Sequence, residues 1–285
     1  MLPENFSIAA MRAEEVPLLA GLAAAEGWNP GLADVDIAWD VDPGAFIALR
    51  RGDELAGGGT IVSYDGQFGF MGLFIVRPEF RGAGLGGVLW RHRLERLRQR
   101  LLPGASIGMD GVFAMVPFYQ RGGFELAWRD LRFEGVAHGV TDPGAIPLSH
   151  MPFEEVERYD RAHVPAPRSR FLSRWIRQPG ALSIGLRERG VLVGYGVARP
   201  CLSGYKLGPV FADRLDLAER IIGSLLASIQ GQPVQLDVPE ANPAAVALAR
   251  RLSLSEAFGC ARMYHGTAPS LPVERIFGVT SFEFG

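Results

Sequence analysis

The feature that most constrains the fold is an apolar, strand-like run that passes through a glycine-rich loop into a helix. The run Phe68–Val76 is ended by Pro78, which cannot continue a strand ladder, and a helical pattern over 85–102 begins just beyond Gly82 and Gly84. Glycines let the backbone N–H groups of such a loop turn toward one point, and the helix N-terminus adds partial positive charge. The segment therefore predicts a site for a phosphate or pyrophosphate group.

Two classes of ligand compete for this loop. Gly82, Gly84 and Gly87 match the pattern G-x-G-x-x-G, and Asp110 ends a later strand at a distance that suits a ribose, as in a dinucleotide site. In the dinucleotide fold, however, the glycines follow the first strand of a parallel sheet almost directly. Here several antiparallel-looking strands come first, and the charged link 77–81 intervenes. A glycine-rich helix start without a ligand is a further interpretation. A P-loop is excluded, because no Gly-Lys-Ser/Thr follows.

The remaining periodicity predicts an α+β fold, with a mixed arrangement of strands and helices, in two similar halves. In the first half, strand-like runs at 46–50, 55–64, 68–76, 105–109 and 124–133 combine with helices at 85–102 and 116–121. The same order returns with strands at 182–186, 192–198, 206–211, 234–238 and 257–264 and helices at 215–229 and 243–252. We expect two tandem domains, each with a mixed, mostly antiparallel sheet flanked by helices.

The length of 285 residues also favours two domains, because one domain typically has about 100–150 residues. Glycines and prolines gather between residues 135 and 148, which is the composition of a linker. We therefore place the N-terminal domain at 1–135, a linker at 136–147 and the C-terminal domain at 148–285.

Composition disfavours several functions. The 29 basic and 31 acidic residues nearly cancel, so the chain lacks the basic surface expected for DNA or RNA binding. Cys201 and Cys260 cannot build a disulfide framework or a paired zinc motif, and we predict no metal. No apolar stretch approaches about 18 residues and no signal-peptide pattern opens the chain, so we expect a cytoplasmic protein without a membrane partner. Lys206 is the one lysine of the chain.

The glycine loop and a second motif resemble the signature of the GNAT superfamily of N-acetyltransferases. Arg81, Gly84 and Gly86 fit that superfamily's [Arg/Gln]-x-x-Gly-x-[Gly/Ala] loop. The segment 117–124, which contains Tyr119, is similar to its Tyr-x-x-x-Gly-Phe segment. The two motifs are separated by a helix and a strand, and this resemblance covers roughly residues 6–133.

A resemblance to two-domain bacterial GNAT proteins of the YitH/HolE type extends over the whole chain, through the segments 107–112, 204–209, 237–242 and 277–283. It implies a catalytic first domain and a second GNAT-like domain. The second domain departs from the pattern after Phe211, where glycines are missing and Asp213 and Asp216 stand in the place of the pyrophosphate. Because these carboxylates would repel a phosphate, we expect one acyl-CoA site in the chain.

The resemblance implies direct transfer of an acetyl or other short acyl group from acyl-CoA to the amine of a small-molecule acceptor. Backbone N–H groups of the loop would hold the pyrophosphate, and the preceding strand would pair with the pantetheine arm and polarise the thioester carbonyl. The residues assigned to acyl-CoA in this way are Leu73, Phe74, Ile75, Val76, Arg81, Gly82, Ala83, Gly84, Leu85 and Gly86. A covalent intermediate is not expected, since neither cysteine has an activating histidine motif and no Gly-x-Ser-x-Gly occurs.

Two side chains are our candidates for proton transfer. Tyr119 matches the position that often serves the family as general acid, and a phenol with a pKa of about 10 keeps its proton at neutral pH. The alternative is a core tyrosine. Asp110 is the candidate base for the acceptor amine, with a cap or substrate anchor as its alternative role. Glu125 and Asp65 are further carboxylates.

The acceptor site is expected where the family's first helices and the second domain meet. The residues proposed for it are Trp28, Arg170, Tyr205 and Lys206, of which the last three would suit an acidic or carboxylate-bearing acceptor. Core packing and structural salt bridges are their alternative roles. We expect a monomer or homodimer. Two other functions stay open at this point: a non-catalytic acyl-CoA-binding sensor or interaction protein, and an NAD(P)-dependent oxidoreductase.

Overall fold

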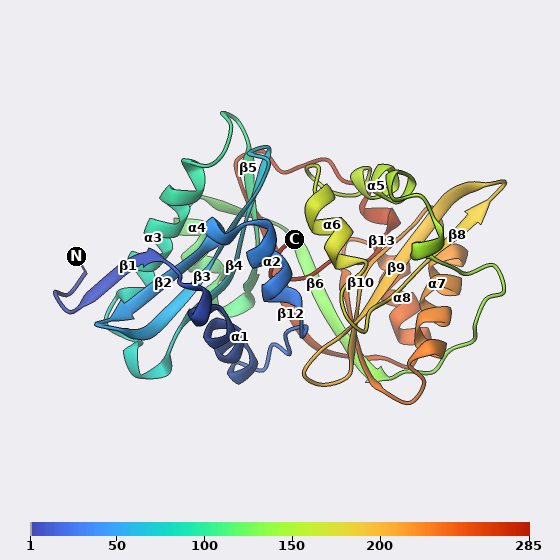
Figure 1. The fold of residues 1–285 in the computed structure, drawn as a ribbon, viewed down its shortest axis with the longest axis horizontal. Coiled ribbons are helices and arrows are strands. Elements are labelled where there is room, and N and C mark those ends of the chain that lie inside the picture. The colour runs from blue at the N-terminus through green and yellow to red at the C-terminus, as the bar shows by residue number, and fades with distance from the viewer. Residues whose placement is uncertain (1) are drawn as a thin grey trace.

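The computed structural model describes residues 2–285 and contains two halves that meet along one sheet (Figure 1). The first half consists of β1 (Phe6–Ala10), α1 (Val16–Ala25), α2 (Asp34–Val41), β2 (Phe46–Arg51), β3 (Glu54–Tyr64), β4 (Phe68–Val76), α3 (Leu85–Arg98), β5 (Ser106–Val112), α4 (Val116–Arg121) and β6 (Phe124–Val136). The second half consists of β7 (Ile146–Pro147), α5 (Phe153–Arg161), α6 (Ser169–Trp175), β8 (Leu182–Glu188), β9 (Val191–Pro200), β10 (Tyr205–Ala212), α7 (Leu215–Ser228), β11 (Pro233–Pro239), α8 (Pro243–Arg251), β12 (Ser255–His265) and β13 (Ile276–Gly278).

The predicted class, mixed α/β with two similar units and a mixed sheet flanked by helices, is confirmed. The bounds of β4 and α4 agree with the prediction. The helix predicted over 85–102 ends at Arg98, because the N–H of Leu102 bonds the carbonyl of Gly66 in a turn rather than a helical carbonyl. The sequence analysis did not predict α2, α5, α6 or β13, each of which has fewer than ten residues.

The halves exchange their last long strands. The strand order is β1-β2-β3-β4-β5-β12-β6-β11-β10-β9-β8-β7, with β13 on β10. The neighbour of β5 is therefore β12 from the second half, and the neighbour of β11 is β6 from the first. One continuous sheet of 13 strands results, rather than two separate ones. The bounds proposed for the two domains stay a prediction.

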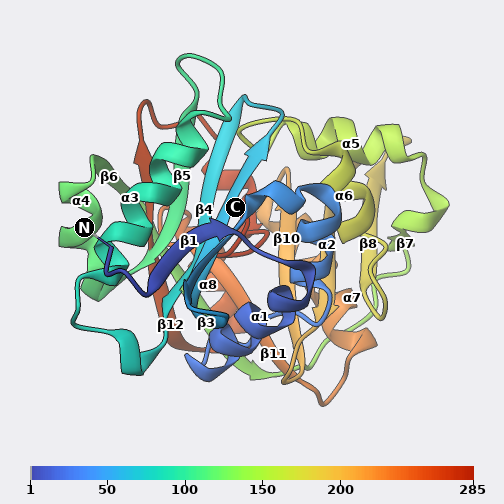
Figure 2. The ribbon, with the colours of Figure 1, turned by 60° about the vertical axis from the view of Figure 1, so that its left-hand side comes forward.

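Helices cover both faces of the sheet, as strand alternation requires. On β2, Phe46 and Ala48 pack into a central core with α1 and α2, whereas Ile47 and Leu49 pack with α3 on the opposite face. Figure 2 shows α1 and α2 on one side of these strands and α3 and α4 on the other. The central core continues into α5 and α6 of the second half, so it joins the halves.

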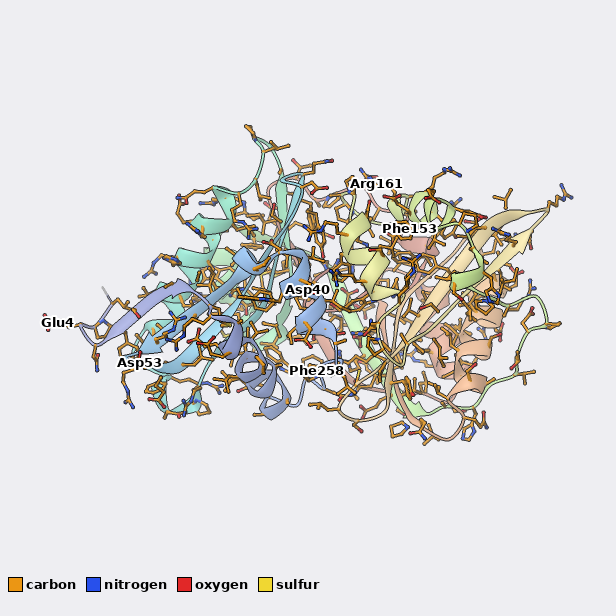
Figure 3. All side chains as sticks on the ribbon, in the orientation of Figure 1. Glu4, Asp40, Asp53, Phe153, Arg161 and Phe258 are labelled. Atoms are coloured by element: carbon orange, nitrogen blue, oxygen red, sulfur yellow. The ribbon has the colours of Figure 1, made fainter. Side chains whose placement is uncertain are left out.

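Ion pairs also link the halves. Arg132 on β6 donates from Nε and Nη2 to the two carboxylate oxygens of Asp237 on β11, each at 2.7 Å. Arg199 on β9 donates to the carboxylate of buried Asp34 on α2. At the surface, Arg174 on α6 donates to Asp40, which is labelled near the middle of the molecule in Figure 3.

The feature that positions the site is the parting of two parallel strands in each half. β4 and β5 pair only from Phe68 to Met71, and β4 then bulges at Leu73, which has φ +48°. β10 and β11 pair only from Tyr205 to Leu207. In the second half, β13 occupies the gap between the parted strands, pairing with β10 and packing on β11. In the first half, the corresponding edge of β4 is left unpaired.

The strand exchange makes a prediction about fragments cut between β6 and β7. Fragments 1–140 and 141–285 should each be unfolded or insoluble alone, because β5 and β11 would each lose a neighbouring strand and expose an apolar edge. Co-expressed, they should form a 1:1 complex that unfolds in one cooperative transition, measured by size exclusion and thermal circular dichroism. Two independently folded fragments with separate transitions would contradict the importance of the exchange.

Candidate active site

A cavity of about 380 Å³ lies where β4 and β5 part. The first half lines it with residues of β4, β5 and the loop before α3, together with Trp90, Tyr119 and Arg132. The second half contributes Phe258, Cys260, Phe282 and Glu283. Figure 3 labels Phe258, which lies between the halves. The cavity therefore combines the predicted acyl-CoA strand with side chains that come from both ends of the sequence.

The unpaired edge of β4 is held open by a buried arginine. Arg93 on α3 is fully buried, and its Nη2 donates to the carbonyls of Thr60 and Gly72, each at 2.6 Å. Thr60 and Gly72 are paired across β3 and β4 directly before the bulge at Leu73. Burial lowers the pKa of Arg93 to about 9, and within residues 2–285 its Nε and Nη1 have no hydrogen-bond partner. Arg93 thus fixes the bulge from beneath the sheet and leaves the outer edge of β4 free.

The glycine loop has the geometry that the sequence predicts. Gly82 and Gly84 have φ values of +84° and +75°, a conformation that side chains with a Cβ disfavour. The backbone N–H groups of 82–86 find no backbone acceptor among residues 2–285, and Gly84 caps α3. Arg81 donates from Nε to the carbonyl of Val76 at 2.7 Å and pairs with Glu26. Free N–H groups at a helix N-terminus favour an anion.

Tyr119 lies in the cavity wall as predicted. Its ring packs closely on β5, where a Cβ on Gly111 would lie 2.4 Å from it, and its centroid is 4.9 Å from that of Trp90. The side chain is buried yet lines the cavity. Burial raises the pKa of Tyr119 to about 12, although the nearby Arg93 cation opposes this shift. The hydroxyl is therefore a proton donor over the whole neutral range.

Asp110 also lines the cavity, but both of its carboxylate oxygens are occupied. Arg262 on β12 donates to them at 2.7 and 2.6 Å. Burial raises the pKa of Asp110, with Arg262 opposing, and burial raises the pKa of neighbouring Asp130 further above its usual value. Glu125 is exposed, and neither it nor Asp65 lines the cavity. The role of Asp110 as base stays a prediction.

The residues predicted for the acceptor are only partly brought together. Trp28 lines the cavity, and its carbonyl accepts from Lys206 Nζ at 2.9 Å. Lys206 is buried behind Trp28, and burial lowers its pKa. Tyr205 is half-buried on β10, and Arg170 on α6 is exposed and donates to the carbonyl of Asp40. Neither of these two lines the cavity.

Sequence reasoning missed several cavity residues: Arg132, Phe258, Cys260, Phe282 and Glu283. The closing segment 277–283 carried a signal, since it belongs to the whole-chain resemblance, but nothing in its letters places it against β4. Burial raises the pKa of the Cys260 thiol well above its usual value, which makes it a poor nucleophile. This fits an expectation of direct transfer.

In the second half, the charged side chains of the glycine-free loop are paired with other residues of the protein. Asp213 accepts a hydrogen bond from Tyr159 at 2.9 Å and lies 3.6 Å from Arg275, and Arg214 pairs with Glu188 and Asp216. The carboxylates predicted to repel a phosphate are thus engaged within the protein. Residues 2–285 contain no group of three or more metal-ligating side chains, and no helix among them is long and apolar enough to cross a membrane.

The first half has an open strand edge that leads to a glycine loop. The second half repeats the parted strands, but β13 fills the gap between them. Two family descriptions match the chain: "Acetyltransferase (GNAT) family" over residues 10–124 and "Acetyltransferase (GNAT) domain" over residues 156–278. The matches fall one in each half. The chain therefore belongs to the GNAT family, as a tandem N-acyltransferase, and membership implies an acyl-CoA co-substrate.

Relatives of similar length support this membership. The chain is 25% identical to the holothin acyltransferase of Pseudoalteromonas sp. (strain SANK 73390) over 275 residues, which cover 95% of this chain and 92% of that protein. It is 26% identical to the uncharacterized N-acetyltransferase YitH of Bacillus subtilis (strain 168), over 79% of each. It is 32% identical to the mycothiol acetyltransferase of Streptomyces bingchenggensis (strain BCW-1), over 47% of each. The predicted relation to the YitH/HolE type is confirmed.

Solved structures share the fold over nearly the whole chain. A putative acetyltransferase from Pyrococcus horikoshii superposes with a TM-score of 0.85 at 21% identity, covering 100% of this chain and 98% of that chain. A tandem GNAT protein from the clavulanic acid biosynthesis pathway gives a TM-score of 0.64 at 15% identity, covering 93% and 99%. The tandem architecture therefore recurs at low sequence identity.

The environment of Tyr119 predicts its titration. Ultraviolet difference titration of the wild type against Tyr119→Phe should show no ionisation of Tyr119 below pH 10.5, since its pKa is raised to about 12. For comparison, a solvent-exposed tyrosine side chain ionises with a pKa of about 10. A difference signal with a midpoint near 10 would mean that the phenol is not buried beside Trp90 as described.

Proposed function

We propose that this protein transfers an acetyl or other short acyl group from acyl-CoA directly to the amine of a small-molecule acceptor. The observation that carries the proposal is the unpaired edge of β4, which runs from the bulge at Leu73 into the N–H groups of the loop at 82–86. An extended amide-bearing arm would pair with such an edge, and a pyrophosphate would fit the loop beyond it. These residues therefore fit an acyl-CoA molecule.

In this proposal each residue of the first half has a defined task. The backbone of 73–76 binds the arm and directs an N–H group at the thioester carbonyl, where negative charge develops. The N–H groups of Arg81–Gly86 and the α3 N-terminus bind the phosphates. Arg93 keeps the bulge in place through Gly72 and Thr60. When bound, acyl-CoA supplies an activated acyl group, so no enzyme nucleophile is needed.

Tyr119 supplies the proton that the departing thiolate requires. Its raised pKa keeps the hydroxyl protonated, so it can donate a hydrogen bond to the sulfur as the C–S bond breaks. A free thiol, with a pKa of about 8.5, is a stronger acid than this phenol, so Tyr119 gives up its proton only as it regains one from the attacking nitrogen. Trp90 and Gly111 hold the ring in place. The alternative role as a core tyrosine is less consistent with a side chain that lines the cavity.

The acceptor class is supported by the names of relatives. The chain resembles proteins named holothin acyltransferase and mycothiol acetyltransferase, both of which act on small molecules. The cavity is lined by both halves, and its volume of about 380 Å³ suits a small molecule. We propose an acyl-CoA site in the first half alone, because β13 and the pairs of Asp213 occupy the equivalent region of the second.

The proposed role of Tyr119 predicts a kinetic result. Tyr119→Phe should lower kcat for acetyl transfer by about 10²-fold or more, while the Kd for acetyl-CoA changes by less than threefold, since only proton donation is lost. Initial rates across an amine library and calorimetric titration measure the two quantities. An unchanged kcat would reject Tyr119 as the acid. Tight acetyl-CoA binding by the wild type without turnover of any amine would favour the alternative function, a non-catalytic acyl-CoA-binding sensor or interaction protein.

The proposed cofactor site predicts one acetyl-CoA per chain in calorimetry. Gly84→Val should weaken acetyl-CoA binding more than tenfold, because a side chain at φ +75° would distort the loop and block close approach. The matched control is Gly104→Val, at φ +84° beyond the other end of α3, which should leave the affinity unchanged. Two equal sites, or binding of NADH or NADPH instead, would contradict the proposal.

A further inference from the structure

Glu283 is a buried carboxylate without a partner in the cavity wall. Its side chain is 6% exposed, and its Oε2 accepts no hydrogen bond from residues 2–285. No basic nitrogen of those residues lies within 4.0 Å of this carboxylate. Arg132, Lys206 and Arg199 attract it from further away, but each donates to another partner, and Asp110 repels it. Because an unpaired buried carboxylate is costly, this position suits a bound cation.

The segment that carries Glu283 is fixed on both sides. Ser281 Oγ accepts from the backbone N–H groups of Glu283 and Phe284 at 3.2 and 3.0 Å. The carbonyl of Phe284 accepts from the hydroxyl of buried Tyr64 at 2.6 Å. The same segment begins with β13, which closes the gap in the second half. The segment therefore runs from the gap between β10 and β11, which β13 fills, to the gap between β4 and β5, and its hydrogen bonds hold Glu283 in one place.

The position of Glu283 relates directly to the bulge in β4. A Cβ on Gly72 would lie 1.9 Å from the Glu283 carbonyl oxygen, so the two backbones are in contact and only glycine fits. Gly72 precedes Leu73, where the strand edge turns into the cavity. Glu283 lines the same cavity as residues 73–76, which are those proposed to bind the thioester.

The second cavity carboxylate, Asp110, is in a different state. Arg262 already donates to both of its oxygens, so Asp110 could accept an ammonium only by giving up this pair. Glu283 has no such competitor. A third cavity carboxylate, Glu26, is paired with Arg81. Of the three, Glu283 is the one with no ion-pair partner among residues 2–285.

We propose that Glu283, supplied by the second half, binds the amine of the acceptor in the site of the first half and receives its proton. The proposal rests on the N-acyltransferase function above and narrows the acceptor to a cationic primary amine on a flat, apolar body. Trp28, Phe258 and Phe282 line the cavity with aromatic surface, which packs well on such a body. An acidic acceptor is disfavoured, because Arg132 and Lys206 are already engaged by Asp237 and the Trp28 carbonyl.

The proton balance of the step is simple. Glu283 takes one proton from the ammonium group, which frees the nitrogen lone pair to form the C–N bond as the C–S bond breaks. Tyr119 gives its hydroxyl proton to the sulfur and is reprotonated by the second proton that the nitrogen loses. Glu283 then releases its proton to solvent, so one amide, one thiol and one proton are the products.

The first test measures binding without turnover. Protein saturated with CoA is titrated by calorimetry with benzylamine, benzyl alcohol and benzoate at pH 7. The wild type should bind benzylamine at least tenfold more tightly than benzyl alcohol, and benzoate least. Glu283→Gln should lose this preference and Glu283→Asp should keep part of it. Equal binding of amine and alcohol, no benzylamine binding, or a preference that survives Glu283→Gln would overturn the proposal.

The second test uses the reaction. Glu283→Gln should lower kcat/KM for benzylamine acetylation at least 100-fold at pH 7, and its kcat/KM should rise with pH as benzylamine itself loses a proton, while the Kd for acetyl-CoA stays unchanged. Glu125→Gln, an exposed matched substitution outside the cavity, should keep the kcat/KM and pH profile of the wild type. A kcat/KM of Glu283→Gln within threefold of the wild type at pH 7 would reject the role of Glu283 as base.

The two proposals can fail separately. If the wild type acetylates amines but Glu283→Gln retains its amine preference and pH profile, the Glu283 assignment is wrong and the N-acyltransferase function stands. If no amine is acetylated although benzylamine binds in a Glu283-dependent manner, the amine site stands and transfer to amines is wrong. Thermal unfolding of each variant, with a Tm within about 3 °C of the wild type, confirms that loss of binding is not loss of fold.

Discussion

The parting of β4 from β5 beyond Met71 is the constraint on which the rest of the site depends. Parallel strands that separate leave backbone donors and acceptors unpaired, and burying such groups without partners is costly. The first half meets this cost in two ways: Arg93 takes the carbonyls on the inner side of the bulge, and the outer edge lines an open cavity. An edge kept in that state is prepared for an extended ligand.

The second half of the chain completes the first. β12 lies next to β5 and brings Arg262 to Asp110, and the segment after β13 brings Phe282 and Glu283 to the cavity. A single GNAT unit cut from this chain would lack its strand neighbour, the partner of Asp110 and part of the cavity wall. The cavity is therefore built by both units of the tandem chain.

Local patterns predicted much of this fold because they depend on neighbouring residues. The strand at 68–76, the glycine loop and the short helix with Tyr119 were identified from periodicity and motif, and the fold class followed. The strand exchange could not be predicted, since β6 and β12 have the same apolar alternation whichever partner they take. Glu283 was missed for the same reason: its place in the cavity wall depends on a backbone contact with Gly72, which lies in the other half of the chain.

The contrast between the two gaps explains why one chain segment affects both. A parted strand pair must be filled by a ligand or by protein, and in the second half β13 fills it, pairing with β10 and taking the Asp237 carbonyl through the N–H of Val279. With β13 in that gap, no space is left for the pantetheine arm of a CoA molecule whose phosphates would lie on the neighbouring loop. Carboxylates such as Asp213 are therefore tolerated in that loop. Closing the second gap also directs the following residues toward the first, where Glu283 reaches β4. In the proposed function, the single cofactor site and the acceptor-binding carboxylate both follow from the course of this one segment.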